Sequence, residues 1–397
     1  MEQLAIFGGK PVRDNKIYYG HQCIDDEDIQ AVVDVMRSDY LTCGPQIAKL
    51  EKKLCDMTGA KYAVVFSNGT AALHAACNAA DVRDGDEVIT SPMTFAASAN
   101  CALYCGAKPV FADIDKHTYN ISPATIKQCI TSKTKAVVAV DYTGQAVQLD
   151  EIMNICKKYG VVCIEDAAHS IGTCYQGKEV GSIADMTTFS FHPVKTVTGG
   201  EGGAVLTNSE QYYKKLLLFR SHGITRNADW MMSKEAAPWY YEQISIGYNY
   251  RITDMQAALI SSQLDKLDFF KRRRRQIVQY YNDQFASMPE VILQKNIEAS
   301  DTCWHLYVLQ LDMQRIRATR EELFCALNAE NVCCNVHYIP VYYFPYYQEL
   351  GYEKGLCPNA ETLYENMLTI PLYPAMTDED VKSVVHAVKK VITYYRR

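Results

Sequence analysis

Short apolar runs alternate with helical stretches from about residue 61 to residue 210, and this alternation constrains the fold more than any other feature. The expected strands cover residues 61–66, 87–90, 109–112, 136–140, 161–164 and 204–206. Each run is too short for a helix and is bounded by turn-forming residues. Strands that alternate with helices build a mostly parallel sheet covered by helices on both faces. The sequence therefore predicts an α/β fold.

The remainder of the chain predicts a second, smaller unit. Helices are expected over about 25–58, and one long helix over 253–285. Beyond it we expect a strand near 304–311, a helix over 319–329, a strand near 332–338 and a final helix from Asp378. A chain of 397 residues exceeds one compact core. We expect a large domain with an N-terminal arm (1–260) and a smaller C-terminal α+β domain (261–397).

Charge and cysteine usage exclude several classes of protein. The formal net charge of -6 gives no reason to expect nucleic acid as a partner. The basic run 271–275 is interpreted as a solvated helix face, with phosphate binding by a neighbouring subunit as the alternative. No apolar stretch is long enough to span a membrane, and the start does not resemble a signal peptide. Fifteen cysteines without a CxxC motif favour reduced thiols in a cytoplasm, and no metal site is expected.

Lys195 is the first candidate for chemistry. It follows an aromatic strand and precedes the glycine-rich turn 199–203. Its neighbours are apolar or small, so its amine is expected to be desolvated, which lowers the pKa of an ammonium group and frees its lone pair. A lysine of this kind forms a Schiff base with an aldehyde, and pyridoxal phosphate (PLP) is the commonest aldehyde cofactor. The alternative is an ordinary surface lysine.

A phosphate-binding turn is predicted upstream of Lys195. The strand 61–66 leads directly into Ser67-Asn68-Gly69-Thr70 and an alanine-rich helix. The free N–H groups and the positive dipole at the start of a helix attract phosphate, and the hydroxyl of Thr70 adds a donor. An ordinary capped helix is the alternative.

Carboxylates end another predicted strand. Glu165 and Asp166 follow the apolar run 161–164, and ligands of α/β sheets bind outside such strand ends. Asp166 is the candidate partner of a protonated pyridine nitrogen, with Glu165 pointing to the other face because strand side chains alternate. His169 either reaches the ring hydroxyl of the cofactor or is a packed histidine. A helix N-cap is the alternative for Asp166.

These motifs occur in an order that resembles the DegT/DnrJ/EryC1/StrS family of sugar aminotransferases. The matching runs span nearly the whole chain and are residues 67–70, 92–95, 165–170, 190–195, 199–203, 220–223, 247–251 and 337–340. The resemblance implies a PLP-dependent transferase of fold type I that acts as a homodimer with active sites at the subunit interface.

The resemblance also implies a role for individual residues. Lys195 corresponds to the lysine that binds the cofactor, Asp166 to the partner of the pyridinium nitrogen, Phe95 to the aromatic side chain on the ring and His169 to the contact with the ring hydroxyl. The phosphate ligands implied are Gly69, Thr70 and Ser190, together with Asn249, which reaches the cofactor of the partner subunit. Arg220 or Arg251 is expected to hold the carboxylate of the amino donor. His337 and Tyr338 are candidate substrate-binding residues, and the tyrosines of 338–347 either line the substrate cleft or pack a domain interface.

A narrower resemblance is to family members that aminate C4 of a UDP-linked 4-keto-6-deoxy-N-acetylhexosamine in pseudaminic acid biosynthesis. Residues 19–22, 38–45, 141–145 and 336–342 carry it. The amino donor implied is L-glutamate. The alternatives are 4-aminotransferases for other UDP- or dTDP-linked sugars, a PLP-dependent sugar dehydratase, and a non-catalytic regulator. The dehydratases need a residue other than lysine at position 195, and a regulator would be expected to lack Lys195 or Asp166.

Overall fold

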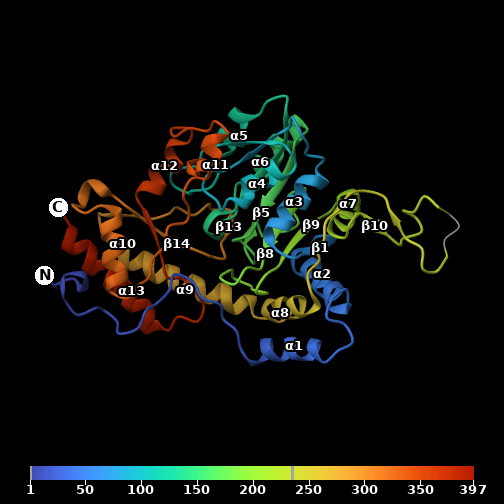
Figure 1. The fold of residues 1–397 in the computed structure, drawn as a ribbon. Coiled ribbons are helices and arrows are strands. Elements are labelled where there is room, and N and C mark those ends of the chain that lie inside the picture. Colours follow the sequence, from blue (N-terminus) through green and yellow to red (C-terminus); the bar gives the residue numbers. More distant parts are fainter. Residues whose placement is uncertain (1, 234–236) are drawn as a thin grey trace.

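A seven-stranded sheet forms the centre of the computed structural model, which describes residues 2–233 and 237–397 (Figure 1). Its strand order is β1-β9-β8-β5-β4-β2-β3. The strands are β1 (Tyr62–Phe66), β2 (Glu87–Thr90), β3 (Lys108–Phe111), β4 (Thr134–Val140), β5 (Val162–Asp166), β8 (Met186–Ser190) and β9 (Gly203–Thr207). β9 is antiparallel to both of its neighbours, whereas the other adjacent pairs are parallel. The predicted mostly parallel α/β sheet is confirmed.

Helices cover both faces of this sheet because its strands are apolar on both sides. One face packs against α2 (Pro45–Thr58), α5 (Pro123–Cys129), α6 (Leu149–Tyr159) and α8 (Asp254–Asp265). The other face packs against α3 (Gly69–Ala79), α4 (Ala97–Tyr104) and α7 (Glu210–Arg220). α1 (Asp26–Met36) lies outside α8, as Figure 1 shows.

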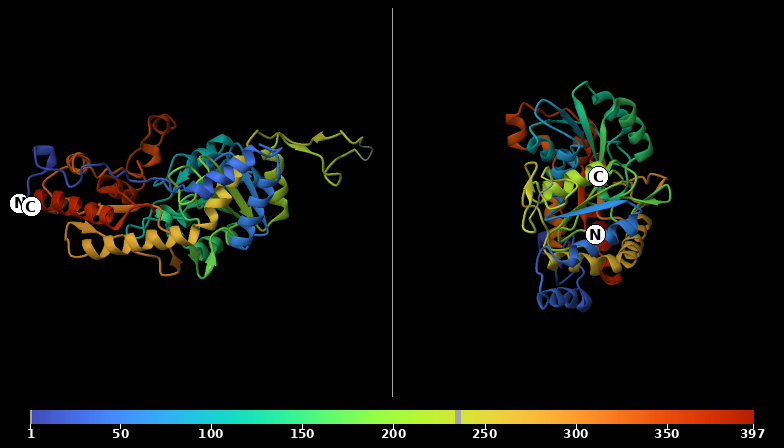
Figure 2. Two further views of the ribbon diagram at one scale, coloured as in Figure 1. Left: turned by 90° about the horizontal axis from the view of Figure 1, so that it is seen from below. Right: turned by 90° about the vertical axis from the view of Figure 1, so that its right-hand side faces the viewer.

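A second hydrophobic core lies toward the chain termini. It is built on the antiparallel sheet of β12 (Val291–Ile292), β14 (Tyr307–Leu311) and β15 (Met367–Ile370). Its helices are α9 (Leu267–Phe285), α10 (Arg320–Ala329) and α13 (Asp378–Tyr395), while α11 (Pro345–Glu349) and α12 (Pro358–Glu365) lie beside it. Leu4 and Ile17 of the N-terminal segment are buried in this core, so both termini lie at the same end of the molecule (Figure 2). The domain boundary at residue 260 stays a prediction.

A narrow hairpin projects from the opposite end of the molecule. Residues 221–233 and 237–247, here called the arm, contain the short strands β10 (Ile224–Thr225) and β11 (Glu242–Gln243) and extend away from the sheet (Figures 1 and 2). A further small sheet combines β6 (Cys174–Tyr175), β7 (Lys178–Glu179) and β13 (Ser300–Asp301).

Two elements differ from the sequence prediction. The long helix expected over 253–285 is two helices, because the backbone of Lys266 turns to φ -100° and ψ 3°. Its ammonium there lies 2.7 Å from Asp25 Oδ1 and 2.5 Å from Asp28 Oδ2, which ties the break to α1. The prediction of a strand near 332–338 is also wrong. The segment forms only single bridges, from Val332 to Ile17 and from Asn335 to Thr369.

The basic run 271–275 is not a solvated face. Arg274 is fully buried, and its Nη1 donates to the carbonyl oxygens of Trp304, His305 and Leu372 at 3.0–3.3 Å. Lys271 and Arg275 both pair with Asp301. Through these contacts, the run attaches α9 to the segment before β14. A run of charged residues in a sequence does not indicate that such contacts form.

All fifteen cysteines are free thiols. Within the described residues, no helix has the length and apolar character needed to cross a membrane, and no cluster of three or more His, Cys, Asp or Glu side chains is suited to a metal ion.

Candidate active site

A cavity of about 730 Å³ lies at the carboxyl ends of the parallel strands. β1, β4, β5 and β8 all point toward it, because β9 is the reversed strand between β1 and β8. Nine of the residues predicted from the sequence line it: Gly69, Thr70, Phe95, Asp166, His169, Ser190, Lys195, His337 and Tyr338. Segments far apart in the sequence therefore meet where ligands bind α/β sheets.

Lys195 reaches this cavity from a tight turn after β8. The turn is closed by hydrogen bonds from Lys195 N to His192 O and from Gly199 N to Phe191 O, both 2.9 Å. Gly199 is needed here, since a Cβ atom would come within 2.6 Å of the Ile260 side chain. Lys195 is only half-buried, because the cavity reaches it, yet the surrounding protein desolvates its amine. Burial lowers the pKa of Lys195 to about 8, and the Asp166 charge only partly opposes this effect.

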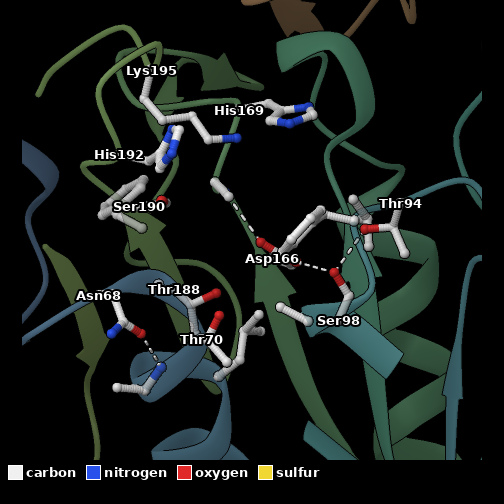
Figure 3. A pocket seen from close by; sticks show the side chains of 18 of the residues that line it. Asn68, Thr70, Thr94, Ser98, Asp166, His169, Thr188, Ser190, His192 and Lys195 are labelled. Carbon is white, nitrogen blue, oxygen red and sulfur yellow. Dashed lines mark hydrogen bonds between the residues drawn. The ribbon is translucent and has the colours of Figure 1, made fainter. Parts of the chain in front are cut away.

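Asp166 is the last residue of β5 and is 4% exposed. Its Oδ2 accepts a hydrogen bond from Ser98 Oγ at 2.5 Å, and its Oδ1 accepts one from the backbone N–H of Ala168 at 3.2 Å. Burial raises the pKa of Asp166, while these hydrogen bonds and the charge of Lys195 act against burial. Figure 3 shows Asp166 and Lys195 in the same cavity, on neighbouring strand ends. As expected from strand alternation, Glu165 faces the other way, toward Thr187 Oγ1 at 2.8 Å.

Buried histidines form the wall next to Lys195. His169 Nε2 lies 3.1 Å from the hydroxyl of Tyr338, and its ring centroid lies 4.6 Å from that of His305. Burial, and then the charge of Lys195, hold the pKa of His169 and His305 well below the ordinary value, so both imidazoles are neutral at pH 7. Burial lowers the pKa of His337 to about 4. The wall therefore consists of uncharged imidazoles, and the Nδ1 atoms of all three have no hydrogen-bond partner among the described residues.

The turn between β1 and α3 forms the opposite end of the cavity. Asn68 caps the helix by accepting from Ala71 N at 2.8 Å, and the N–H groups of the first helical residues, Gly69 and Thr70, have no carbonyl within the helix to bind. A Cβ on Gly69 would lie 2.9 Å from Ser190 Cβ. β9 holds the two segments together, since Gly203 pairs with both Phe66 and Ser190. The hydroxyls of Thr70 and Ser190 are thereby brought to one helix N-terminus (Figure 3).

Three predicted residues do not line the cavity of this chain. Arg220 Nη1 is 2.6 Å from Glu51 Oε1 and 3.1 Å from the carbonyl oxygen of Val65, so its guanidinium is already paired. Asn249 is exposed beside the arm, where its backbone forms an isolated antiparallel β-bridge with Ser221. Arg251, two residues later, is half-buried, and neither residue lines the cavity.

Of the five tyrosines in 338–347, two are buried, while Tyr338 and Tyr343 are half-buried and Tyr346 is exposed. Tyr338 lines the cavity, whereas Tyr342 and Tyr347 are buried and pack on Phe111. The hydroxyl of Tyr342 donates to Glu361 at 2.6 Å, and that of Tyr347 donates to Asn100 at 2.7 Å. For these two residues, the packing alternative is correct.

Several lining residues were given no role from the sequence, although Tyr19 and Thr94 lie in runs that carry the family resemblance. They include Tyr19, Thr94, Ser98, Thr188 and His305. Tyr19 arrives with the N-terminal segment and stacks on His337 at a centroid distance of 4.8 Å. Thr94 and Ser98 are hydroxyl residues within an otherwise apolar, alanine-rich run, and only that contrast in polarity could have pointed to them.

Comparisons with known proteins agree with this architecture. The DegT/DnrJ/EryC1/StrS aminotransferase family model matches residues 22–389. The spore coat polysaccharide biosynthesis protein SpsC of Bacillus subtilis is 40% identical over 382 residues, which are 96% of this chain and 98% of that protein. The UDP-4-amino-4,6-dideoxy-N-acetyl-beta-L-altrosamine transaminase of Campylobacter jejuni is 38% identical over 371 residues, covering 93% and 95% of the two chains.

One solved structure is similar to this chain over nearly all of its residues. It is PseC of Helicobacter pylori, an aminotransferase involved in the biosynthesis of pseudoaminic acid, with a TM-score of 0.88, 32% identity, and coverage of 96% of this chain and 100% of that chain. The fold and its cavity, with a lysine and an aspartate at adjoining strand ends, define the class as an α/β aminotransferase. Within that class, the chain belongs to the DegT/DnrJ/EryC1/StrS aminotransferase family.

Proposed function

We propose that this protein transfers the amino group of L-glutamate to C4 of a UDP-linked 4-keto-6-deoxy-N-acetylhexosamine, with PLP as its cofactor, in pseudaminic acid biosynthesis. The observation that carries the proposal is the desolvated amine of Lys195 in one cavity with the buried carboxylate of Asp166. The names of the Campylobacter jejuni and Helicobacter pylori relatives support the sugar and the pathway.

The residues of the cavity fit PLP in chemistry and in position. Lys195 supplies the amine for its aldehyde, and Asp166 supplies an anion for its ring nitrogen. The absence of a Cβ on Gly69 leaves the start of α3 open for its phosphate, with hydroxyls from Thr70 and Ser190. Phe95, which is 62% exposed at the cavity, offers an aromatic face for the ring, and His169 offers a neutral imidazole for its hydroxyl. When bound, PLP withdraws electrons from the donor Cα and carries the nitrogen from donor to acceptor.

Lys195 moves the proton in this scheme. With a pKa near 8, a substantial fraction of its amine is free base at neutral pH and can accept the proton from the donor Cα. The same Nζ then returns the proton to the carbon that carries the transferred nitrogen. The neutral wall of His169, His305 and His337 contributes no competing cation.

We assign the donor carboxylate to Arg251 in preference to Arg220. Glu51 already neutralises Arg220, and exchanging that partner would leave the half-buried Glu51 carboxylate without its cation. Arg251 lies two residues after Asn249 at the base of the arm, the segment assigned below to the proposed dimer interface. His337 and Tyr338 are assigned to the sugar, next to Lys195 in the cavity.

The proposed functional unit is a homodimer with shared active sites. The arm exposes large apolar side chains, namely Met232 at 87%, Trp239 at 77% and Ile246 at 79%. Such a concentration of exposed apolar surface is typical of a protein interface. In this arrangement Asn249 reaches the cofactor phosphate of the partner subunit.

The test is a product assay with defined sugars. The protein is incubated with PLP, L-glutamate and a UDP-linked 4-keto-6-deoxy-N-acetylhexosamine, and the aminated sugar and 2-oxoglutarate are quantified by mass spectrometry. We expect the two products in equal amounts, and neither product with Lys195→Ala. A wild-type protein that forms no aminated sugar from any 4-keto nucleotide sugar would overturn the proposal.

A second candidate is a 4-aminotransferase for another nucleotide-linked 4-keto sugar. The identity to SpsC, 40%, is as high as the identity to the Campylobacter jejuni enzyme, 38%, and favours keeping this candidate. Parallel assays with UDP- and dTDP-linked 4-keto sugars of different stereochemistry distinguish the two candidates by the preferred acceptor. Formation of a deoxy sugar without nitrogen would instead identify a dehydratase.

A further inference from the structure

Two buried hydroxyls lead from the Phe95 segment to Asp166. Ser98 Oγ lies 2.5 Å from Asp166 Oδ2, and Thr94 Oγ1 lies 2.7 Å from Ser98 Oγ. Ser98 is 1% exposed and Thr94 is 3% exposed, so bulk water is a poor substitute for either contact. Figure 3 shows the three side chains in line at the edge of the cavity.

The chemistry of the groups fixes the direction of these hydrogen bonds. An ionised carboxylate can only accept, so the Ser98 hydroxyl gives its single proton to Asp166. Ser98 Oγ is then left with lone pairs only, and the proton between the two hydroxyls has to come from Thr94. The relay runs from Thr94 to Ser98 to Asp166. A protonated Asp166 could instead donate to Ser98 and reverse this order, so the order given is that of the ionised carboxylate.

Asp166 depends on this support because of its location. Burial raises the pKa of its carboxyl group, and the Ser98 hydroxyl is the strongest of the contacts that lower it, ahead of the Ala168 N–H and the charge of Lys195. A neutral carboxyl group at this place could not hold a proton on the ring nitrogen of PLP as an ion pair.

We infer that Ser98 and Thr94 are positioning residues that keep Asp166 ionised and aim its carboxylate at the ring nitrogen of the cofactor. The inference rests on the proposed function. Because Phe95 lies between the two residues in sequence, the segment that presents an aromatic face to the ring also orients the anion that meets its nitrogen.

Other ionisable groups around Asp166 have to be considered in any pH experiment. The ammonium of Lys195, from the turn after β8, favours the carboxylate. Tyr338, from the segment after α10, has its pKa raised by burial and by Asp166. Asp141 directly follows β4, and Glu165 lies on β5. Burial raises the pKa of both carboxyl groups. The charge of Asp141 raises the pKa of Glu165 further, whereas the hydrogen bonds that Asp141 makes, first of all with Ser170, lower its own pKa. None of these groups belongs to the relay, so the substitutions of Ser98 and Thr94 leave their side chains in place. Only the Ser170 control below removes a hydrogen bond from one of them, Asp141.

The test measures protonation of the ring nitrogen directly. PLP labelled with ¹⁵N at the ring is bound to the wild type, Ser98→Ala, Ser98→Thr, and Thr94→Val, and the ¹⁵N chemical shift is followed as a function of pH. We expect Ser98→Ala to reduce the preference for the protonated ring nitrogen about tenfold or more, since a hydrogen bond to a charged group is lost. Thr94→Val should give a smaller change in the same direction, and Ser98→Thr should restore the wild-type titration.

Ser170→Ala is a matched control. Ser170 Oγ donates to Asp141 Oδ2 at 2.5 Å and is fully buried, but neither residue lines the cavity. This variant should lose comparable thermal stability and keep the wild-type ¹⁵N titration. Equal titrations for Ser98→Ala and Ser170→Ala would overturn the inference. Failure of the proposed function would look different, because the wild type would then form no aminated sugar in the product assay, whatever the ¹⁵N titrations of the variants show.

Discussion

At the scale of single residues, the desolvated amine of Lys195 sets the pH at which the protein can react with an aldehyde. Its pKa is lowered from 10.5 to about 8, so the amine is mostly protonated at pH 6 and mostly free base at pH 9. The rate at which PLP attaches to the apoprotein should therefore rise about tenfold per pH unit below pH 8 and level off above it. Stopped-flow absorbance measures this rate. A rate of PLP attachment that continues to rise up to pH 10, as expected for an ordinary lysine, would contradict the assignment.

Lys195 also illustrates what a local sequence can predict. Its apolar and small neighbours indicated desolvation, and the structure agrees. The same local pattern gave no hint of His305, which approaches from the segment before β14, or of Tyr19, which comes with the N-terminal segment. Contacts of this kind depend on tertiary packing, so the residues next to Lys195 in the sequence do not predict them.

At the scale of elements, the β1–α3 turn should be intolerant of a side chain at Gly69. Gly69→Ala would place a Cβ 2.9 Å from Ser190 Cβ and push the turn away from β8. We expect the affinity for PLP to fall by about tenfold or more, because two groups of phosphate donors lose their alignment. Fluorescence titration of the apoprotein with PLP measures this. Gly160→Asn serves as a control, since nothing lies within 4 Å of a Cβ there, and Gly160 precedes β5, at the opposite end of that strand from Asp166.

The strands β4 and β5 carry a buried carboxyl pair whose effect depends on pH. Asp141 and Glu165 are both fully buried, and Glu165 Oε1 has no donor among the described residues when both groups are ionised. Burial raises the pKa of Glu165 well above its ordinary value and that of Asp141 to about 7. The folded state therefore holds a proton that the unfolded chain releases near pH 4, and stability falls as pH rises from about 4 toward 7 and beyond.

Glu165→Gln should reduce this pH dependence. The amide can donate the hydrogen bond that the protonated carboxyl group provides, without needing a proton from solvent. We expect the melting temperature of the variant to decline less than that of the wild type between pH 5 and pH 8, as measured by calorimetry. Identical slopes for the two proteins would mean that the pair does not share a proton.

Element types followed from the sequence more readily than their direction or continuity. The apolar runs located the strands, but β9 reads like its neighbours and gives no sign that it is antiparallel. The apolar spacing of 253–285 suits one helix, and only the attraction of Lys266 to Asp25 and Asp28 marks the break. Arg274 lies in a run of like charges, and its burial is determined by carbonyl groups of Trp304, His305 and Leu372.

At the scale of the whole molecule, the arm should be the determinant of dimerisation. Replacing Met232 and Trp239 by Glu puts two charges on its exposed apolar surface, and we expect a monomer at micromolar concentration by analytical ultracentrifugation. Exchanging the exposed Ile29 of α1 for Glu is the control for a general effect of surface charge. A protein that remains dimeric after the arm substitutions would place the interface elsewhere.

The proposed sharing of active sites between subunits makes a separate prediction for mixed dimers. Lys195→Ala and Asn249→Ala chains should each be inactive or strongly impaired alone. In a mixed dimer, one site combines the intact Lys195 of one chain with the intact Asn249 of the other, so co-expression should restore roughly a quarter of wild-type activity. If mixing restores nothing, Asn249 acts within its own subunit or not at the cofactor.

The most direct test of the central claim is the absorbance spectrum of the purified protein with PLP, before and after L-glutamate and then a series of UDP-linked 4-keto sugars. The account predicts a visible band from lysine-bound cofactor that is absent in Lys195→Ala, that shifts on addition of glutamate, and that returns with the correct sugar. A wild-type protein that shows no such band after incubation with PLP would contradict the roles given to Lys195 and Asp166.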